Sequence, residues 1–309
     1  MPNTTNTLTI ISRDAEVYSA LLADRQLPDL TVSICEQSAD NVDLSRIEIL
    51  LSEPNIAAQI LPQCHRLKWM QSTWAGNTPL IQQTKKDYVL TGVKGIFGVA
   101  MREYVFAYLL YFERNIEAFE QRWTQPSVGT LKGKKLGILG AGSIASELVT
   151  VAKVFGMQVV GANRSGKSEH GYDAIYAIDR LSEFTPELDY LVSILPDTPD
   201  THHLVNAEFL AQLPAHCVFI NAGRGRTVDD HALINALNNQ QLKAAVLDVF
   251  DIEPLPREHP YWRMANVYVT QHTAAISQPS AIVDVFAENY MRWRRQQPLK
   301  YKVDFTRGY

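Results

Sequence analysis

The chain has 309 residues, of which 46% are hydrophobic and 20% charged, a composition that is typical of a folded globular protein and excludes an intrinsically disordered one. Its 29 Lys and Arg against 33 Asp and Glu give a formal net charge of −4, which argues against a general affinity for nucleic acid or acidic membranes. The longest apolar run, Tyr104–Phe112, is about half as long as the roughly 18 residues of a membrane span, so no spanning helix is predicted.

The cysteines and the N-terminal residues indicate a cellular compartment. Cys35, Cys64 and Cys217 are odd in number, widely spaced and without a CxxC motif, so we expect neither a disulfide framework nor a metal site. The first residues, MPNTTNTLTI, match neither a signal peptide nor an Arg-rich transit peptide. We therefore expect a cytoplasmic protein, with about two domains at this length.

Short apolar runs alternate with helical patterns in the N-terminal third. Helices are predicted at Asp14–Ala23 and Asn55–Leu61. The predicted strands are Leu8–Ile11, Thr31–Ile34, Ile47–Leu51, Leu67–Gln71 and Tyr88–Leu90. This alternation predicts a parallel sheet of about five strands with helices on both faces, as in a flavodoxin-like domain.

A second alternation follows a long helix. Met101–Arg122 contains neither Gly nor Pro and is predicted to be one helix that leads into the loop Thr124–Gly133. The strands predicted after it are Leu136–Leu139, Val159–Ala162, Tyr190–Ile194, Cys217–Asn221, Ala244–Val249 and Val267–Thr270. Six strands in two halves is the count of a dinucleotide-binding fold.

The last predicted helix, after Ser277, is expected to return to the N-terminal domain. The predicted fold class is therefore α/β, with two Rossmann-like domains that each contain a doubly wound parallel sheet. We assign residues 101–275 to an NAD(P)-binding domain. Residues 1–100 and 276–309 form a discontinuous substrate-binding domain.

A glycine-rich turn, GAGSIA, occupies residues 140 to 145 between the first strand of the second alternation and the helix that follows it. Gly140 allows a tight turn, Gly142 lets backbone N–H groups approach a pyrophosphate, and the small Ala145 lets the helix pack close to the strand. Glycines at such a turn can also serve chain geometry alone. The strand before the turn and the helix after it favour the binding of a dinucleotide.

The end of the second strand of this domain indicates which dinucleotide binds. An NAD site usually has Asp or Glu there, about 20 residues after the glycines, whereas this chain has the neutral Asn163. Arg164, Ser165 and Lys167 follow it and offer donors to a 2′-phosphate. The alternative is a solvated basic loop without a ligand. We predict that NADPH is preferred and that NADH is a possible second cofactor.

Three polar residues each follow a predicted apolar strand of the same domain. They are Arg224 in INAGRGRTVDDHAL, Glu253 in LDVFDIEPL and His272 in VYVTQHTAA. Ligands of parallel sheets bind beyond the carboxyl ends of the strands, so all three can face one ligand. Arg224 can form two hydrogen bonds to a carboxylate. His272 can act as a general acid, and Glu253 beside it would favour the imidazolium; this set suits the reduction of a 2-keto acid.

The glycine turn and these three stretches together resemble the D-isomer-specific 2-hydroxyacid dehydrogenase family, and the likeness covers essentially the whole chain. The resemblance implies that Arg224 binds the substrate, that Glu253 polarises the histidine, and that His272 protonates the carbonyl while the cofactor delivers hydride. The spacings of the three residues are similar to those of short members that reduce glyoxylate and hydroxypyruvate.

The same resemblance implies further cofactor contacts. Ser143 and Ile144 would contact the pyrophosphate and Asp248 the nicotinamide amide. The remaining cofactor-binding residues that we assign are Pro196, Thr201, Ala222 and Gly223.

The N-terminal domain contributes the segment KWMQSTWAGNTPL. In the family, the loop at this place offers backbone N–H groups to the substrate carboxylate, and the matching positions are Ala75 and Gly76. We suggest that Trp74 forms an apolar wall of the substrate pocket, although a Trp can equally belong to the core.

The predicted protein is thus an NADPH-preferring reductase of small 2-keto acids. Relatives usually form homodimers, and the aromatic residues of the long helix, Tyr104, Phe106, Tyr108, Tyr111 and Phe112, can supply such a surface or simply belong to the core. The alternative function is a nucleotide-sensing binding protein without significant turnover, because the family also includes corepressors.

Overall fold

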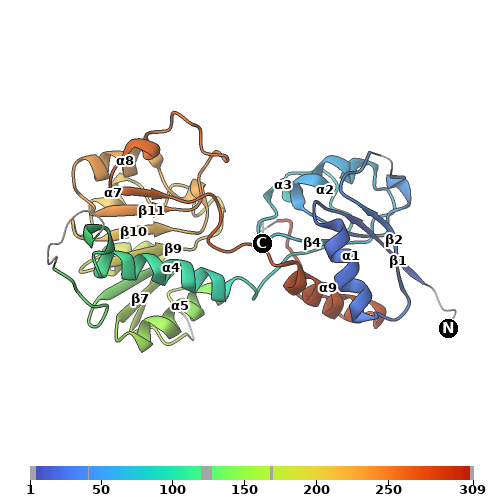
Figure 1. Cartoon of the computed structure of the whole chain (residues 1–309), viewed down its shortest axis with the longest axis horizontal. Helices are drawn as coiled ribbons and strands as arrows, with labels where there is room; N and C mark the ends of the chain where they lie inside the picture. The colour runs from blue at the N-terminus through green and yellow to red at the C-terminus, as the bar shows by residue number, and fades with distance from the viewer. Residues whose placement is uncertain (1–4, 41, 120–126, 168–169, 307–309) are drawn as a thin grey trace. The chain divides into compact units, whose positions relative to one another are not determined.

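The computed structural model describes residues 5–40, 42–119, 127–167 and 170–306. It divides into two compact units (Figure 1). Unit 1 consists of Met1–Ile96 and Ser277–Tyr309, and unit 2 of Phe97–Ile276. Each contains one parallel sheet, and the predicted α/β class with two Rossmann-like domains is confirmed.

Unit 1 has a five-stranded sheet in the order β2-β1-β3-β4-β5, which is the flavodoxin-like order. The strands are β1 (Asn6–Ile11), β2 (Leu30–Glu36), β3 (Ile49–Ser52), β4 (Trp69–Ser72) and β5 (Val89–Thr91). The helices are α1 (Ala15–Arg25), α2 (Pro54–Ile60), α3 (Thr78–Ile81) and α9 (Pro279–Arg294), with short 3-10 turns at Leu44–Arg46 and Leu61–Gln63.

Helix α9 packs against α1 and against the sheet of unit 1. The ring of Trp69 on β4 stacks on Phe286, with centroids 5.0 Å apart, and on Trp293, with centroids 5.6 Å apart. The Tyr290 hydroxyl donates to the Pro28 carbonyl at 2.9 Å. Burial of these aromatic rings joins the last helix of the chain to the first sheet.

Unit 2 has a seven-stranded sheet in the order β12-β11-β10-β9-β6-β7-β8, the order of a dinucleotide-binding sheet with one strand added at the β12 edge. The strands are β6 (Lys135–Leu139), β7 (Gln158–Asn163), β8 (Ala174–Ala177), β9 (Tyr190–Ser193), β10 (Val218–Asn221), β11 (Ala244–Leu247) and β12 (Val267–Val269). The longer helices are α4 (Gly98–Glu113), α5 (Ser143–Val154) and α8 (Asp230–Asn238). The short ones are α6 (Leu181–Phe184), α7 (Ala207–Leu210) and the 3-10 turns at Ile116–Phe119, Ile178–Arg180, Gly225–Thr227 and Pro260–Arg263.

The prediction of six strands in this unit is wrong, because it misses β8. This strand has the sequence AIYA, is four residues long, lies at the edge of the sheet and is only partly buried. An apolar run as short as this one cannot be distinguished from part of a helix by its periodicity.

Helix α4 begins at Gly98 and ends at Glu113, earlier than the predicted Arg122. The Arg114 N–H still donates to the Leu110 carbonyl, but Asn115 has a left-handed backbone with φ of 51°. Asparagine tolerates this conformation and is common where helices end. Residues 120–122 of the predicted helix lie outside the described part of the chain.

Two layers of helices cover the sheet of unit 2. Leu136 and Ile138 of β6 join a buried cluster with residues of α4 and α5. A separate cluster contains residues of α6, α7 and α8. Toward this second layer, a Cβ at Gly137 would lie 2.7 Å from a methyl group of Leu188, so the strand needs glycine there.

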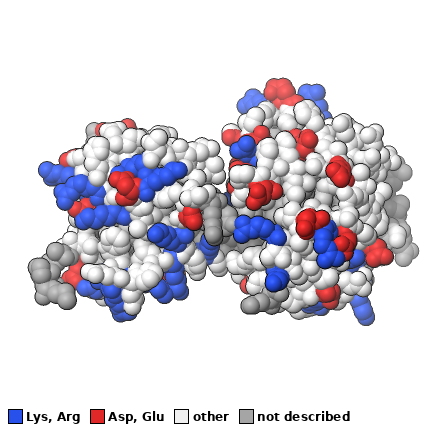
Figure 2. All heavy atoms as spheres, turned by 180° about the vertical axis from the view of Figure 1, so that it is seen from behind, with Lys and Arg blue, Asp and Glu red and all other residues white. Residues whose placement is uncertain are grey.

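The visible charges differ between the two units. In Figure 2 the charged side chains of unit 2 are of mixed sign, whereas those of unit 1 are mainly basic. Several basic residues of unit 1 have acidic partners, among them Arg66 and Lys68 on Glu48, each at 2.7 Å. Among the helices of the described residues, none has the length and apolar character needed to cross a bilayer.

Candidate active site

The residues predicted to bind the cofactor and substrate in unit 2 follow the carboxyl ends of its strands. All strand pairs of this sheet are parallel, and their last residues are in register: Leu139 pairs with Ser193, Ser193 with Asn221, and Asn221 with Leu247. The loops after these strands therefore leave from one edge of the sheet. The order of the strands reverses between β6 and β9, which is where such sheets bind their ligands.

The glycine turn lies at this reversal point. Gly140 has φ of 104°, and a Cβ there would lie 3.2 Å from the Ile194 carbonyl oxygen, so both backbone and packing require glycine. Gly142 is different, because its φ is −89° and a Cβ would meet nothing within 4 Å. No feature of the described protein demands glycine at residue 142. An open face before the N-terminus of the 12-residue helix α5 fits the approach of a pyrophosphate.

The first turn of α5 contacts segments that carry other predicted site residues. Ile144 packs on a small buried cluster that contains Met101, Ala222 and Ala274. The glycine turn, the end of β10 and the segment that follows His272 are thereby brought together in one unit.

Asn163 braces the loop that carries the predicted phosphate ligands. Its side-chain oxygen accepts from the N–H groups of Ser165 and Gly166 at 3.0 and 2.7 Å, and its amide donates to the Lys167 carbonyl at 2.8 Å. Arg164, Ser165 and Lys167 are exposed. Neither Arg164 nor Lys167 forms an ion pair with the residues that the structure describes, so both charges can be offered to an anion.

The loop after β9 contains Pro196 and Thr201. Pro196 is exposed, whereas Thr201 is buried and its hydroxyl donates to the Pro196 carbonyl at 2.7 Å. Thr201 also accepts from the Thr198 N–H at 2.9 Å. The threonine side chain therefore holds the loop in shape.

Arg224 lies three residues after the end of β10 and is partly buried. Burial lowers its pKa, against the opposing charges of Glu253 and Asp197. The only hydrogen bond of its guanidinium among the described residues is from Nη1 to the Gly223 carbonyl at 2.6 Å, and the guanidinium has no ion pair there. A partly buried guanidinium with free donors is suited to a carboxylate ligand.

Two glycines fix the backbone around Arg224. A Cβ at Gly223 would lie 2.7 Å from the Leu195 backbone, and one at Gly225 would lie 1.9 Å from the Phe250 carbonyl carbon. Glycine at these positions lets the loop after β10 approach the loops after β9 and β11. Packing alone requires glycine at residue 223, whose contact with the cofactor stays a prediction.

The structure brings Glu253 and His272 together. The His272 Nδ1 lies 2.9 Å from Glu253 Oε2, and the Phe250 N–H donates to Glu253 Oε1 at 3.0 Å. Burial opposes ionisation of Glu253, but the hydrogen bonds from His272 and Phe250 and the charges of His272 and Arg224 outweigh it, and its pKa is lowered. An ionised Glu253 only accepts, so Nδ1 carries a proton and Nε2 is left for proton transfer to a ligand.

Asp248 follows β11 and is 1% exposed. Its carboxylate accepts from the N–H groups of Thr273 and Ala274 at 2.8 and 3.0 Å. Asp248, which we predict to contact the nicotinamide amide, is therefore hydrogen-bonded to the segment that follows His272.

In unit 1, Trp74, Ala75 and Gly76 follow β4. Trp74 is 38% exposed, so its indole is not part of the core of that unit. The Trp74 N–H donates to the Ser72 hydroxyl at 3.2 Å, which shapes the start of the loop.

Sequence reasoning missed Gly225, on which the approach of the Arg224 and Glu253 loops depends. Its signal was the glycine directly after Arg224 in the motif GRGRT. In the described residues there is no group of three or more His, Cys, Asp or Glu that could hold a metal ion. All three cysteines are free.

The chain is similar in sequence to known proteins. The family described as D-isomer specific 2-hydroxyacid dehydrogenase, NAD binding domain, matches residues 106–274. The glyoxylate/hydroxypyruvate reductase A of Escherichia fergusonii is 33% identical over 217 residues, which are 69% of this chain and 70% of the relative.

Solved structures are similar over nearly the whole chain. A D-isomer specific 2-hydroxyacid dehydrogenase family protein from Aeromonas salmonicida is 36% identical, with a TM-score of 0.92 over 97% of this chain and 99% of the other. An NADPH-dependent glyoxylate/hydroxypyruvate reductase from Sinorhizobium meliloti, in complex with NADP and sulfate, is 26% identical. Its TM-score is 0.88 over 98% of this chain and 100% of the other. The chain therefore belongs to the D-isomer specific 2-hydroxyacid dehydrogenase family and is an oxidoreductase.

Proposed function

We propose that this protein uses NADPH to reduce a small 2-keto acid, of the glyoxylate or hydroxypyruvate type, to the D-2-hydroxy acid. The observation that carries the proposal is the Glu253–His272 pair at 2.9 Å, in the same unit as a partly buried Arg224 without an ion pair among the described residues. Two relatives whose names specify glyoxylate/hydroxypyruvate reductase support the substrate class.

In the proposed mechanism each of the three residues has a separate task. Arg224 binds and orients the substrate carboxylate through its free N–H donors. His272 holds a proton on Nε2 and gives it to the carbonyl oxygen, while Glu253 holds the other ring nitrogen and stabilises the positive charge. When bound, the reduced nicotinamide supplies the hydride.

The cofactor would be held by residues of unit 2. We assign the pyrophosphate to the backbone of the glycine turn, where Gly142 leaves an open face, and to Ser143 and Ile144. Asn163, Arg164, Ser165 and Lys167 would hold the 2′-phosphate. The solved NADP complex of the S. meliloti reductase, and an NADPH complex of a family member from Xanthobacter autotrophicus at 28% identity and a TM-score of 0.89, support NADPH.

Arg164→Ala should reduce the preference for NADPH over NADH. The variant loses a charged hydrogen bond to the 2′-phosphate, worth about 1.5–3 kcal/mol, or roughly 10- to 150-fold in affinity. The measurement is the ratio of kcat/KM with the two cofactors. Arg180→Ala is the matched control, because that exposed arginine of the same unit is paired with Glu183 instead. An unchanged ratio in Arg164→Ala would refute the assignment.

The substrate contacts in unit 1 are part of the same proposal. The backbone N–H groups of Ala75 and Gly76 would donate to the substrate carboxylate, and Trp74 would limit the size of the group on C2. The decisive experiment follows NADPH oxidation at 340 nm with a panel of small and bulky 2-keto acids, repeated with NADH. Turnover of the small acids supports a reductase, whereas tight NADPH binding without turnover of any acid would favour the nucleotide-sensing alternative.

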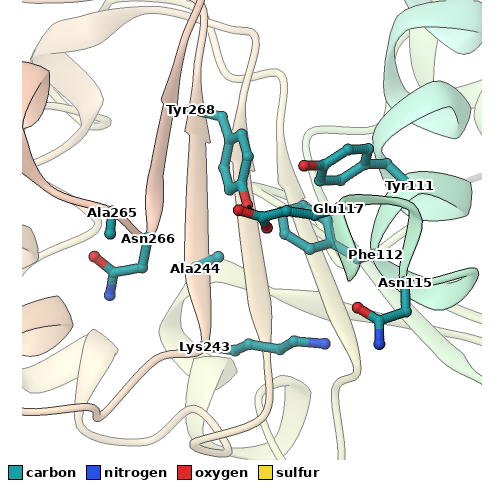
Figure 3. Close-up of a pocket in the computed structure, with 9 residues that line it drawn as sticks. All are labelled: Tyr111, Phe112, Asn115, Glu117, Lys243, Ala244, Ala265, Asn266 and Tyr268. Carbon is teal, nitrogen blue, oxygen red and sulfur yellow. Dashed lines mark hydrogen bonds between the residues drawn. The ribbon is translucent and has the colours of Figure 1, made fainter. Parts of the chain in front are cut away.

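We also expect a homodimer and a location in the cytoplasm. The aromatic residues of α4 are at least partly buried in unit 2, and Tyr111 and Phe112 pack edge-on against Tyr268, with centroids 5.5 and 5.2 Å away. Beside them lies a pocket of about 230 Å³, shown in Figure 3, which Lys243 and Glu117 also line. Light scattering of the dilute protein should give twice the mass of one 34.8 kDa chain, and a mass equal to one chain would contradict the dimer.

A further inference from the structure

His272 has a left-handed backbone, with φ of 56°, which is uncommon for a residue with a side chain. The contacts of the following N–H groups explain it. The His272 N–H donates to the Asp248 carbonyl at 2.7 Å, the Thr273 N–H to Asp248 Oδ1 at 2.8 Å, and the Ala274 N–H to Oδ2 at 3.0 Å. Successive N–H groups around a left-handed residue form an anion-binding concavity, which here holds a carboxylate of the chain itself.

The Thr270 hydroxyl completes this arrangement at 2.5 Å from Asp248 Oδ1. Asp248 is nearly fully buried and has no ion pair among the described residues, so its carboxyl oxygens depend on hydrogen-bond donors. The Thr270 hydroxyl donates to Asp248 Oδ1, so the proton of Thr270 points to Asp248. The hydroxyl oxygen of Thr270 can then accept a hydrogen bond.

Tyr104 of α4 supplies the donor for that oxygen. Its hydroxyl lies 2.8 Å from Thr270 Oγ1, and because the Thr270 proton is already used, Tyr104 donates. Burial and the charge of Asp248 raise the pKa of Tyr104, against the hydrogen bond with Thr270, so the hydroxyl remains a donor at neutral pH. The hydrogen bonds therefore run in one direction, from Tyr104 to Thr270 to Asp248.

We propose that Tyr104 and Thr270 are positioning residues that act through Asp248 to hold His272 in the conformation from which its imidazole meets Glu253. The proposal rests on the proposed reductase function. Neither residue is assigned a contact with substrate or cofactor. Their effect is on the orientation of the general acid, and a small displacement of such a group is expressed in kcat more than in the binding of either ligand.

Thr270→Val tests the proposal, because valine has a similar shape and no hydroxyl. We expect kcat for glyoxylate reduction to fall roughly 10- to 100-fold, whereas KM for NADPH, which Asp248 can affect through the nicotinamide amide, should change less. Thr270→Ser, which keeps the hydroxyl, should restore most of the rate. Tyr104→Phe should lower kcat in the same direction by a smaller factor, and Tyr108→Phe, on the same helix and with its ring 5.1 Å from that of Tyr104, should not.

A second measurement does not require turnover. In ¹⁵N-histidine-labelled protein, the Nδ1–H signal of His272 is identified by its loss in His272→Gln. It should shift or disappear in Thr270→Val and remain in Thr270→Ser and Tyr108→Phe. If the wild type reduces no 2-keto acid, the proposed function fails while this signal still tests the positioning role.

A Thr270→Val variant with both wild-type kcat and an unchanged His272 signal would overturn the inference. Should Thr270→Val fail to fold, as judged by its thermal unfolding, Tyr104→Phe takes its place with the same two readouts. In that case a wild-type kcat and signal in Tyr104→Phe would overturn it.

Discussion

His272→Gln should lower kcat for the 2-keto acid by about 10² to 10⁴-fold, the usual contribution of a positioned general acid. Glutamine approximates the size of histidine and can still donate to Glu253 through its amide, but it cannot release a proton to the substrate. The affinity for NADPH, followed by the fluorescence of the bound nicotinamide, should be little changed because His272 is not assigned to the cofactor. The comparison of kcat with cofactor affinity separates loss of chemistry from loss of folding.

The matched control for this substitution is His216→Gln. His216 also lies near a carboxylate, with Nε2 3.6 Å from Asp189 Oδ1, but it precedes β10 and so lies at the amino ends of the strands. The same chemical change there should leave kcat unaffected. A near-normal kcat in His272→Gln would show that another group delivers the proton, and the proposed mechanism would then be wrong.

The convergence of Arg224, Glu253 and His272 on one edge of a sheet could be predicted because each follows a recognisable apolar strand. Parallel strands have their carboxyl ends together, so the sequence predicts one edge of the sheet for three residues that are far apart in the chain. The turn at Gly140 was predictable for a similar reason, since a left-handed residue between a strand and a helix favours glycine.

Features that depend on contacts between distant segments could not be predicted in this way. Tyr104 and Thr270 are 166 residues apart, and nothing in either local sequence indicates that their hydroxyl groups meet. The early end of α4 depends on the left-handed Asn115, whose neighbours have strong helical propensity. The strand β8 could not be predicted because its apolar run of four residues is too short to be distinguished from part of a helix.

Arg224→Gln should lower kcat/KM for the 2-keto acid by about 10² to 10⁴-fold, because it removes two charged hydrogen bonds to the carboxylate, each worth about 1.5–3 kcal/mol. Arg224→Lys keeps the charge but not the planar pair of donors, and its loss should be intermediate. Arg226→Gln is the control, since that half-exposed side chain lies 3.3 Å from Asp251 and such surface pairs contribute little.

Arg224→Gln should also change the pH dependence of the reaction. The charge of Arg224 is one of the influences that lower the pKa of Glu253, so its removal raises that pKa. A carboxylate with a lowered pKa stays ionised until the pH falls through that value, and raising the pKa moves the acid limb of the kcat profile of Arg224→Gln to higher pH. Saturating the weakened variant with substrate separates this effect from binding. A variant with an unchanged KM for the keto acid and an unchanged acid limb would show that Arg224 neither binds the substrate nor influences Glu253.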